Sequence, residues 1–153
     1  SRRQRQMCIR DRLEIVVDPE LETNVAKSYE LVQKSAEGDL PVYGVNTGFG
    51  KLANKIIPSE DREQLQKNLV LSHCAGIGEP LPEDVTRLMM VLKIVSLSLG
   101  ASGVKWSTIK QIERIINSGI VPEIPHQGSV GASGDLAPLA HMAAVMIGEG
   151  FAF

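Results

Sequence analysis

The chain has 153 residues, of which 43% are hydrophobic and 22% charged, and its formal net charge is −2. This composition is typical of one globular domain with a sizeable core, and it gives no signal for binding a polyanion. Cys8 and Cys74 lie far apart and fit neither a disulfide framework nor a metal-ligand spacing, so we expect a reducing, cytoplasmic setting. Lys93 interrupts the longest apolar run, which is therefore too short to span a membrane.

Residues 1–12 carry five arginines and one aspartate. A basic run of this kind is compatible with an arm that binds nucleic acid. It also resembles translated adapter sequence joined to a truncated reading frame. We expect this segment to be non-native or disordered, and residues 13–153 to form the domain.

The first elements of the domain are predicted from turn residues and periodicity. Residues 13–17 are predicted to form a short strand. Asp18 and Pro19 then mark a helix start, with proline at the first helical position. Apolar residues recur at helical spacing as far as Ala36, and Gly38 supplies the C-terminal stop. We expect this helix to pack on the core through one face and to expose an acidic one.

Residues 43–50 read YGVNTGFG, a loop with three glycines and two aromatic rings. Large rings in a loop either fill the core beneath it or are presented to a ligand. Spacing alone leaves both interpretations of Tyr43 and Phe49 open.

A further helix is predicted to begin at Ser59, which is a suitable N-cap followed by acidic residues. His73 lies four residues after Leu69 and therefore on the same helical face. A lone histidine at a helix end is usually capped or satisfied in the core, so this position alone does not indicate a ligand.

Two more helices follow. Residues 82–99 are predicted to be helical up to Gly100, with an apolar face that we expect to be core: Val85, Leu88, Met89, Leu92 and Leu99. The next helix carries Ile109, Ile112, Ile115 and Ile116 and ends at Gly119. Residues 121–125 are predicted to be extended, because residues before proline avoid the α region.

Residues 128–135 read GSVGASGD, with a glycine at every third position, and lead into an apolar stretch, 136–147, predicted to be a helix. Asp135 is a suitable N-cap, and Pro138 falls in the first turn, where its missing N–H costs little. The loop is compatible with a simple turn before a buried helix, or with a phosphate cradle at a helix start.

The three small residues Ala132, Ser133 and Gly134 raise a third possibility. In a tight turn the amide nitrogen of Gly134 can attack the carbonyl carbon of Ala132, and dehydration of Ser133 then gives a methylidene-imidazolone ring. Only small residues allow so close an approach. The ring is an electrophile that needs no external cofactor, and the helix start behind it favours negative charge on the ring.

Residues 131–141 (GASGDLAPLAH) resemble the signature of the aromatic amino acid ammonia-lyases, whose self-made cofactor is this methylidene-imidazolone, MIO. Residues 43–50, 69–81 and 128–150 resemble the family in the same order. The resemblance implies a mostly α, L-aspartase-like fold with glycine-rich loops and a short strand pair. Residues 13–153 would be its N-terminal portion. Since the family continues into a long-helix bundle and a homotetramer, we expect the 153-residue chain alone to be inactive and to expose apolar surface.

The resemblance also implies roles for individual residues. Tyr43 matches the base that removes the β-proton of the substrate, and Ser133, within the ring, would activate the substrate amine. Ser72 and His73 match the position that selects the substrate, which is Ser-His in enzymes acting on histidine. A histidine there would hydrogen-bond the substrate imidazole, and an unpaired buried polar group would penalise a phenyl ring.

The implied reaction is elimination of ammonia from L-histidine to give urocanate. Alternatives are a phenylalanine or tyrosine ammonia-lyase, an aminomutase, and a non-catalytic domain of the same fold. We expect structural roles for His126 and His141, no metal site, and no nucleic-acid or membrane partner.

Overall fold

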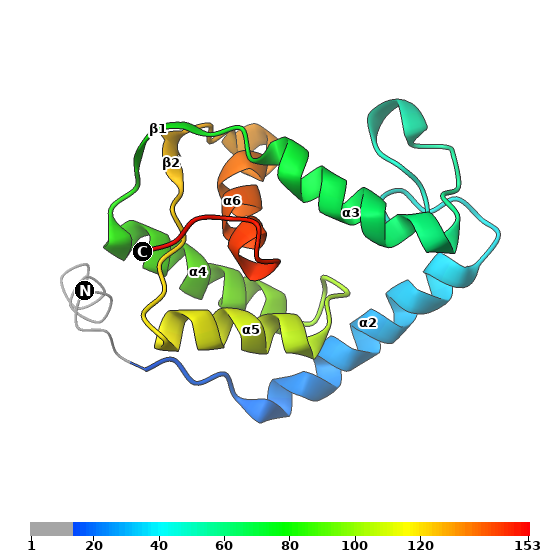
Figure 1. Cartoon of the computed structure of the whole chain (residues 1–153). Coiled ribbons are helices and arrows are strands. Elements are labelled where there is room, and N and C mark those ends of the chain that lie inside the picture. The colour runs from blue at the N-terminus through cyan, green and yellow to red at the C-terminus, as the bar shows by residue number, and fades with distance from the viewer. Residues whose placement is uncertain (1–13) are drawn as a thin grey trace.

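The computed structural model describes residues 14–153, so segment 1–12 and its expected non-native origin lie outside the described residues. The described chain is mostly helical, as predicted, and its five α-helices are α2 (Glu22–Glu37), α3 (Ser59–His73), α4 (Glu83–Ser98), α5 (Trp106–Asn117) and α6 (Leu136–Met146). Short 3₁₀ turns are η1 (Pro19–Leu21), η2 (Gly50–Leu52) and η3 (Gly131–Ser133). Two strands, β1 (Ile77–Pro80) and β2 (Pro125–Gln127), form one antiparallel pair (Figure 1).

The hydrophobic core lies where α5 packs against α4 and the first half of α2. Ile109, Ile112 and Ile116 recur at helical spacing along α5, and each is at most 1% exposed. Val25 of α2 is fully buried against them. Burial of each such side chain stabilises the fold by roughly 1.5–3 kcal/mol. The apolar period predicted for this helix is therefore confirmed as the centre of the core.

The predicted signals at the ends of helices are largely confirmed. Asp18 is the N-cap of η1, where its Oδ1 accepts a hydrogen bond from the Glu20 amide at 2.9 Å, and Pro19 is the first residue of that turn. Gly38 is the C-cap of α2. Gly100 follows α4 with a φ of +71°, which a glycine adopts without a Cβ penalty.

The prediction that Ser59 is an N-cap is wrong by one residue. Pro58 occupies the cap position of α3, and the Ser59 hydroxyl donates to the Glu60 carboxylate instead. Proline fixes an extended approach to the helix without a side-chain cap. The two acidic residues of the first turn, Glu60 and Asp61, lie where the helix dipole favours them.

The strand predicted at 13–17 is absent from its described residues, 14–17. The Ile15 amide donates to the Asn117 side chain at 2.8 Å, and the Asn117 amide group donates back to the Ile15 carbonyl at 2.7 Å. The Val17 amide donates to the carboxylate of Glu113 at 2.8 Å. Side chains of α5 thus bond backbone groups that a neighbouring strand would otherwise pair, and no sheet forms.

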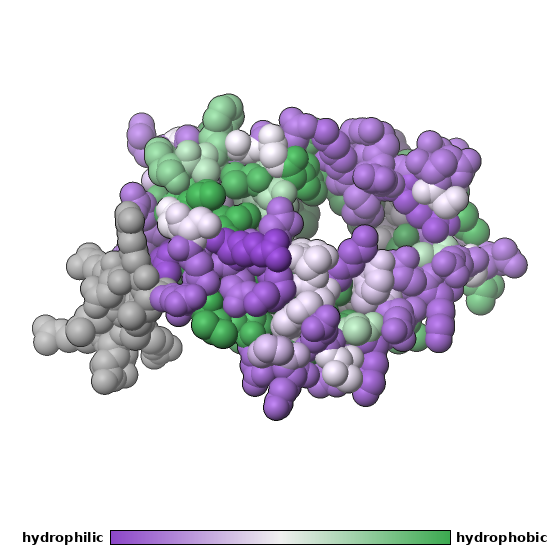
Figure 2. All heavy atoms as spheres, turned by 60° about the horizontal axis from the view of Figure 1, so that its bottom comes forward, coloured by the Kyte–Doolittle hydropathy of each residue, from purple (hydrophilic) through white to green (hydrophobic). Residues whose placement is uncertain are grey.

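The core face predicted for residues 82–99 is wrong for four of its five residues, since only Met89 packs against the core. Val85, Leu88, Leu92 and Leu99 are 37–75% exposed, and α4 buries Met90, Ile94 and Leu97 instead. The helix is apolar on both sides, and α2 and α5 cover only one of them. Figure 2 shows hydrophobic side chains gathered on the upper left of the face it presents. The expected exposure of apolar surface is thus confirmed.

The antiparallel pair joins two distant segments of the chain. Ile77 pairs with Gln127 and Pro80 with Pro125, so the exit from α3 lies beside the entry to the glycine loop. The chain before β2 is extended as predicted, and Pro122 forms a bridge with Ala152. This pairing joins the segment that follows Ser72 and His73 to the segment that precedes Ala132, Ser133 and Gly134, while Tyr43 lies on a third segment.

None of the helices in residues 14–153 is long and apolar enough to cross a membrane.

Candidate active site

One pocket, of about 370 Å³, lies between α3, α6 and the loop of residues 43–50. Most of its surface is apolar, and two polar side chains, Tyr43 and His73, reach it. The remaining lining residues are Phe49, Leu69, Val70, Leu136, Leu139, Ala140 and Ala143. An apolar pocket with a few convergent polar groups is typical of a small-molecule site.

His73 lies at the end of α3 and is oriented by its own helix. Its Nδ1 lies 2.7 Å from the carbonyl oxygen of Leu69. A carbonyl only accepts, so Nδ1 is the donor, and in the neutral ring Nε2 keeps its lone pair. The tautomer therefore leaves a hydrogen-bond acceptor on a side chain that lines an otherwise apolar pocket.

Ser72 does not line the pocket. Its hydroxyl donates to the same Leu69 carbonyl at 2.9 Å and lies 3.3 Å from His73 Nδ1. The structure thus brings Ser72 and His73 together through one backbone oxygen.

Tyr43 is 62% exposed and stands over the pocket, with its ring edge-to-face with Phe49 at 5.6 Å between centroids. Such aromatic pairs are worth about 0.5–1.5 kcal/mol beyond area burial. Both rings are therefore presented to the pocket, which decides between the two interpretations left open for this loop.

Asn46, which the sequence interpretation missed, is the residue that shapes the Tyr43 loop. It is fully buried, and its Oδ1 accepts from the Val42 amide at 2.7 Å. Its Nδ2 lies within hydrogen-bond distance of three backbone carbonyls, those of Ser35, Gly38 and Leu40. A buried asparagine with this many backbone partners ties the loop to the end of α2. The signal available in the sequence was an asparagine among glycines, typical of side-chain-to-backbone turns.

The glycine loop approaches α6 through η3 and two left-handed residues. Gly134 has a φ of +88° and Asp135 a φ of +57°. Asp135 is the N-cap residue of α6, as predicted, but its side chain makes no cap hydrogen bond, because Oδ1 accepts from the Ser129 hydroxyl at 2.6 Å. The carboxylate therefore closes the loop on itself rather than capping the helix.

The geometry of the loop fits formation of a ring from Ala132, Ser133 and Gly134. The amide of Gly134 donates to the carbonyl of Gly131 at 3.1 Å, next in the chain to the Ala132 carbonyl that it would attack. A Cβ on Gly134 or Gly131 would meet nothing within 4 Å, so no neighbouring group crowds the turn at these two positions. The Ser133 hydroxyl donates to the Val130 carbonyl at 2.9 Å and is exposed.

Ser133 does not itself line the pocket of Tyr43 and His73. Leu136, three residues further on, does. The glycine loop and the pocket therefore meet at the start of α6. Tyr43 and His73 reach the pocket itself, whereas Ala132, Ser133 and Gly134 lie in the loop that leads into the helix forming one of its walls.

The two remaining described histidines contact backbone groups. His126 Nδ1 lies 2.9 Å from the carbonyl of Glu79, across the strand pair. His141 Nε2 accepts from the Gly76 amide at 3.2 Å. Within residues 14–153 no three His, Cys, Asp or Glu side chains come together as a metal site.

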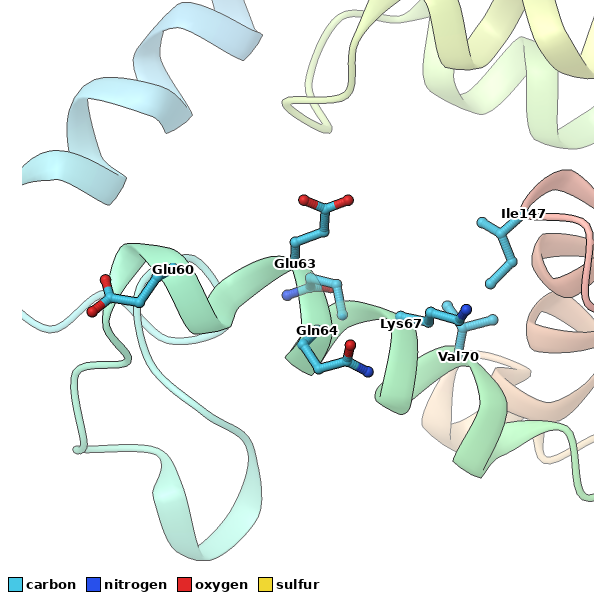
Figure 3. A pocket seen from close by; sticks show the side chains of 7 residues that line it. Glu60, Glu63, Gln64, Lys67, Val70 and Ile147 are labelled. Carbon is cyan, nitrogen blue, oxygen red and sulfur yellow. The ribbon is translucent and has the colours of Figure 1, made fainter.

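A larger hollow, of about 590 Å³, lies further along α3 (Figure 3). Five of its seven lining residues are polar, and all but Ile147 belong to α3. The amino group of Lys67, one of these residues, pairs with the Glu149 carboxylate at 2.6 Å. None of the predicted site residues reaches it. We therefore take the smaller pocket, which holds Tyr43 and His73, as the candidate active site.

The chain is similar in sequence and fold to known proteins. The sequence model of the family described as aromatic amino acid lyase matches residues 3–153, which includes most of the arginine-rich segment. Solved structures that share the fold include the following three. Histidine ammonia-lyase from Trypanosoma cruzi is 38% identical over 90% of this chain, with a TM-score of 0.81. Tyrosine aminomutase from Streptomyces globisporus is 34% identical over 99%, with a TM-score of 0.87.

Ergothionase from Treponema denticola is 26% identical over 99% of this chain, with a TM-score of 0.92. The chain spans only 26%, 28% and 30% of the lengths of the lyase, the aminomutase and the ergothionase. The predicted fold class is thus confirmed, and the three relatives differ in the reaction that their names give.

Proposed function

Because the chain belongs to the aromatic amino acid lyase family, we propose that its protein eliminates ammonia from L-histidine to give urocanate. The observation that carries the choice of histidine is the contact of 2.7 Å between His73 Nδ1 and the Leu69 carbonyl oxygen. Nδ1 is thereby committed to this carbonyl, and Nε2 of the same ring is left as an acceptor on the pocket wall.

A hydrogen-bond acceptor on the pocket wall, His73 Nε2, matches a substrate whose ring carries a hydrogen-bond donor. The N–H of an imidazole donates to it, whereas a phenyl ring leaves it unpaired in an apolar pocket, at a cost of about 1–3 kcal/mol. Ser72 supports the same choice, since its hydroxyl shares the Leu69 carbonyl that fixes the His73 ring. We assign Ser72 and His73 as the substrate-selecting pair.

A phenol O–H also donates, so tyrosine is the second candidate substrate, for a tyrosine ammonia-lyase or aminomutase. The 34% identity to a tyrosine aminomutase keeps this alternative in view. Phenylalanine is disfavoured, because its ring offers no donor to His73.

We assign Tyr43 as the base that takes the β-proton of the bound substrate. Its phenol stands on the pocket side of the 43–50 loop, held by Phe49 and by the turn that Asn46 ties down. A base that its loop holds at the pocket is the arrangement that proton abstraction from a bound substrate needs, and this placement supports the assignment.

Ala132, Ser133 and Gly134 would form the methylidene-imidazolone on which the family in general depends. The group would supply an electrophilic methylene, derived from Ser133, that activates the substrate amine. The residues around it bind and orient: His73 holds the ring, the apolar wall of α6 excludes water, and Tyr43 receives the proton. We further propose a cytoplasmic homotetramer as the working form, with no nucleic-acid or membrane partner.

The test uses protein expressed from its complete reading frame. The peptide containing Ala132, Ser133 and Gly134 should be lighter by two waters, and histidine should be turned over faster than tyrosine or phenylalanine. Tyr43→Phe should keep the mass change and lose turnover, and Ser133→Ala should lose both. An unmodified peptide in folded wild-type protein would contradict the lyase proposal, and preferred turnover of tyrosine would select the alternative.

A further inference from the structure

Gly76 lies where three segments of the chain meet. It follows α3 by three residues and precedes β1. The other two segments are the end of β2 at Gly128 and the first turns of α6. Gly76, Gly128 and His141 do not line the candidate active site.

The junction is closely packed around backbone atoms. A Cβ at Gly76 would lie 3.1 Å from His141 Nε2, 3.2 Å from Pro125 Cβ and 3.3 Å from the Gln127 carbonyl oxygen. A Cβ at Gly128, whose φ is +137°, would lie 3.1 Å from Gly76 Cα. Glycine at both positions lets the exit of α3 touch the entry of the glycine loop directly.

His141 supplies the polar link across this junction. The Gly76 amide donates to its Nε2 at 3.2 Å, so the ring accepts there and, when neutral, carries its proton on Nδ1. Burial lowers the pKa of His141, which the carboxylate of Glu123 partly opposes. Both the geometry and this shift favour the neutral ring that the bond requires.

The junction also lies between the two parts of the candidate site. Gly76 is three residues after His73, and Gly128 is five residues before Ser133. Ala140 lines the pocket, while its neighbour His141 is not among the lining residues and bonds Gly76 instead. Helix α3 has no fully buried residue, so apolar burial alone fixes its C-terminal end weakly.

We propose that His141 is a positioning residue that, given the function proposed above, holds Gly76 so that His73 keeps a fixed place relative to the glycine loop. His141 does not contact the pocket. It acts through the backbone at the end of α3, and it sets where the substrate ring is held relative to the atoms that react. A histidine on the loop-to-helix segment thus contributes to substrate selection from outside the pocket.

The experiment compares two substitutions of one residue in protein from the complete reading frame. Leucine at position 141 keeps comparable bulk but removes the acceptor, whereas glutamine offers a carbonyl oxygen for the Gly76 amide. We expect His141→Leu to raise KM for histidine about tenfold and to narrow the preference for histidine over phenylalanine. We expect His141→Gln to restore both to within about twofold. Ring formation, read from the peptide mass, should be intact in both variants.

A second readout is independent of activity. Hydrogen exchange at the Gly76 amide should accelerate in His141→Leu and stay slow in His141→Gln, because exchange reports local opening. His126→Leu is the matched control. It removes another contact between a histidine and the backbone, that of His126 Nδ1 with the Glu79 carbonyl at 2.9 Å, which does not involve Gly76 itself. It should leave KM and Gly76 exchange unchanged.

An unchanged substrate preference in a folded His141→Leu variant would overturn the positioning role, even if that variant is less stable. Unchanged exchange at Gly76 would overturn the hydrogen bond on which the role depends. A wild-type protein inactive on every aromatic amino acid would instead overturn the proposed function, and the exchange measurement would still decide whether His141 holds Gly76.

Discussion

The α5 core and the α3 site region are built in opposite ways. Helix α5 buries Ile109, Ile112 and Ile116 on one continuous face. Helix α3 is of similar length but buries no residue fully, and it packs on α6 through half-buried side chains. The site region is instead fixed by single polar residues that bond to backbone: Asn46 for the Tyr43 loop and His141 for the end of α3.

Stability and the arrangement of the site therefore depend on different parts of the chain. A core held by many apolar contacts loses stability when any one of them is removed. A site held by a few backbone hydrogen bonds is placed accurately by them, and losing one displaces a functional group. Substitutions in the two regions should therefore differ in size and in what they change.

The largest loss of stability is expected from Ile112→Ala in the core. Ile112 is 1% exposed, so truncation leaves a cavity and should lower the free energy of unfolding by about 2–5 kcal/mol. Leu92→Ala on the exposed side of α4, where Leu92 is 58% exposed, should change it by less than about 0.5 kcal/mol. Denaturant unfolding of both variants measures the contrast. Equal losses at the two positions would contradict the assignment of the core to the buried face of α5.

A smaller loss is expected from Asn46→Ala, accompanied by a functional defect. The substitution removes the acceptor for the Val42 amide and the donor to three carbonyls, and should cost about 1–3 kcal/mol. Because the same turn carries Tyr43, turnover should fall by more than the decrease in the fraction of folded protein explains. Asn46→Asp keeps the acceptor for the Val42 amide but sets a buried carboxylate oxygen against the three carbonyls, so its loss should be at least as large. Full activity in a destabilised Asn46→Ala protein would show that Tyr43 does not depend on this turn.

The difference between the α5 core and the α3 site region also explains which features could be predicted from the sequence. The α5 face and the ends of helices at Gly38 and Gly100 follow from periodicity and turn chemistry, which are local. The exposed side of α4 looks identical to a core face, since periodicity does not say which side a neighbour covers. The placement of His73 depends on a contact between residues that are distant in the sequence. These residues are Gly76 and His141, 65 positions apart, and no local sequence pattern predicts their contact.

The acid sensitivity of the core is the next expected effect. Burial alone would raise the pKa of Glu113, but hydrogen bonds from Lys110 and the Val17 amide, with the charges of Lys110 and Arg114, outweigh it and lower the pKa. The ionised Glu113 carboxylate therefore stabilises the fold. This stabilisation is complete when the pH lies above the pKa of glutamate in the unfolded chain, about 4.3, and is lost as the pH falls through the lower pKa of the folded state. Free energies of unfolding between pH 6 and pH 3 should show the decline, and Glu113→Gln should flatten it. If the stability of Glu113→Gln declines by the same amount between pH 6 and pH 3, other carboxylates cause the decline.

The smallest effect is expected at the ion pair between Lys67 of α3 and Glu149 beyond α6. The atoms lie 2.6 Å apart, but the side chains are 45% and 43% exposed, so water and salt screen the pair. Lys67→Ala should change the free energy of unfolding by at most about 1 kcal/mol, and the change should vanish at high salt. A loss as large as that of Asn46→Ala would mean that charge, rather than backbone hydrogen bonds, fixes α3 on α6. A small loss, together with altered substrate preference in His141→Leu, would place the control of the site in the Gly76 junction.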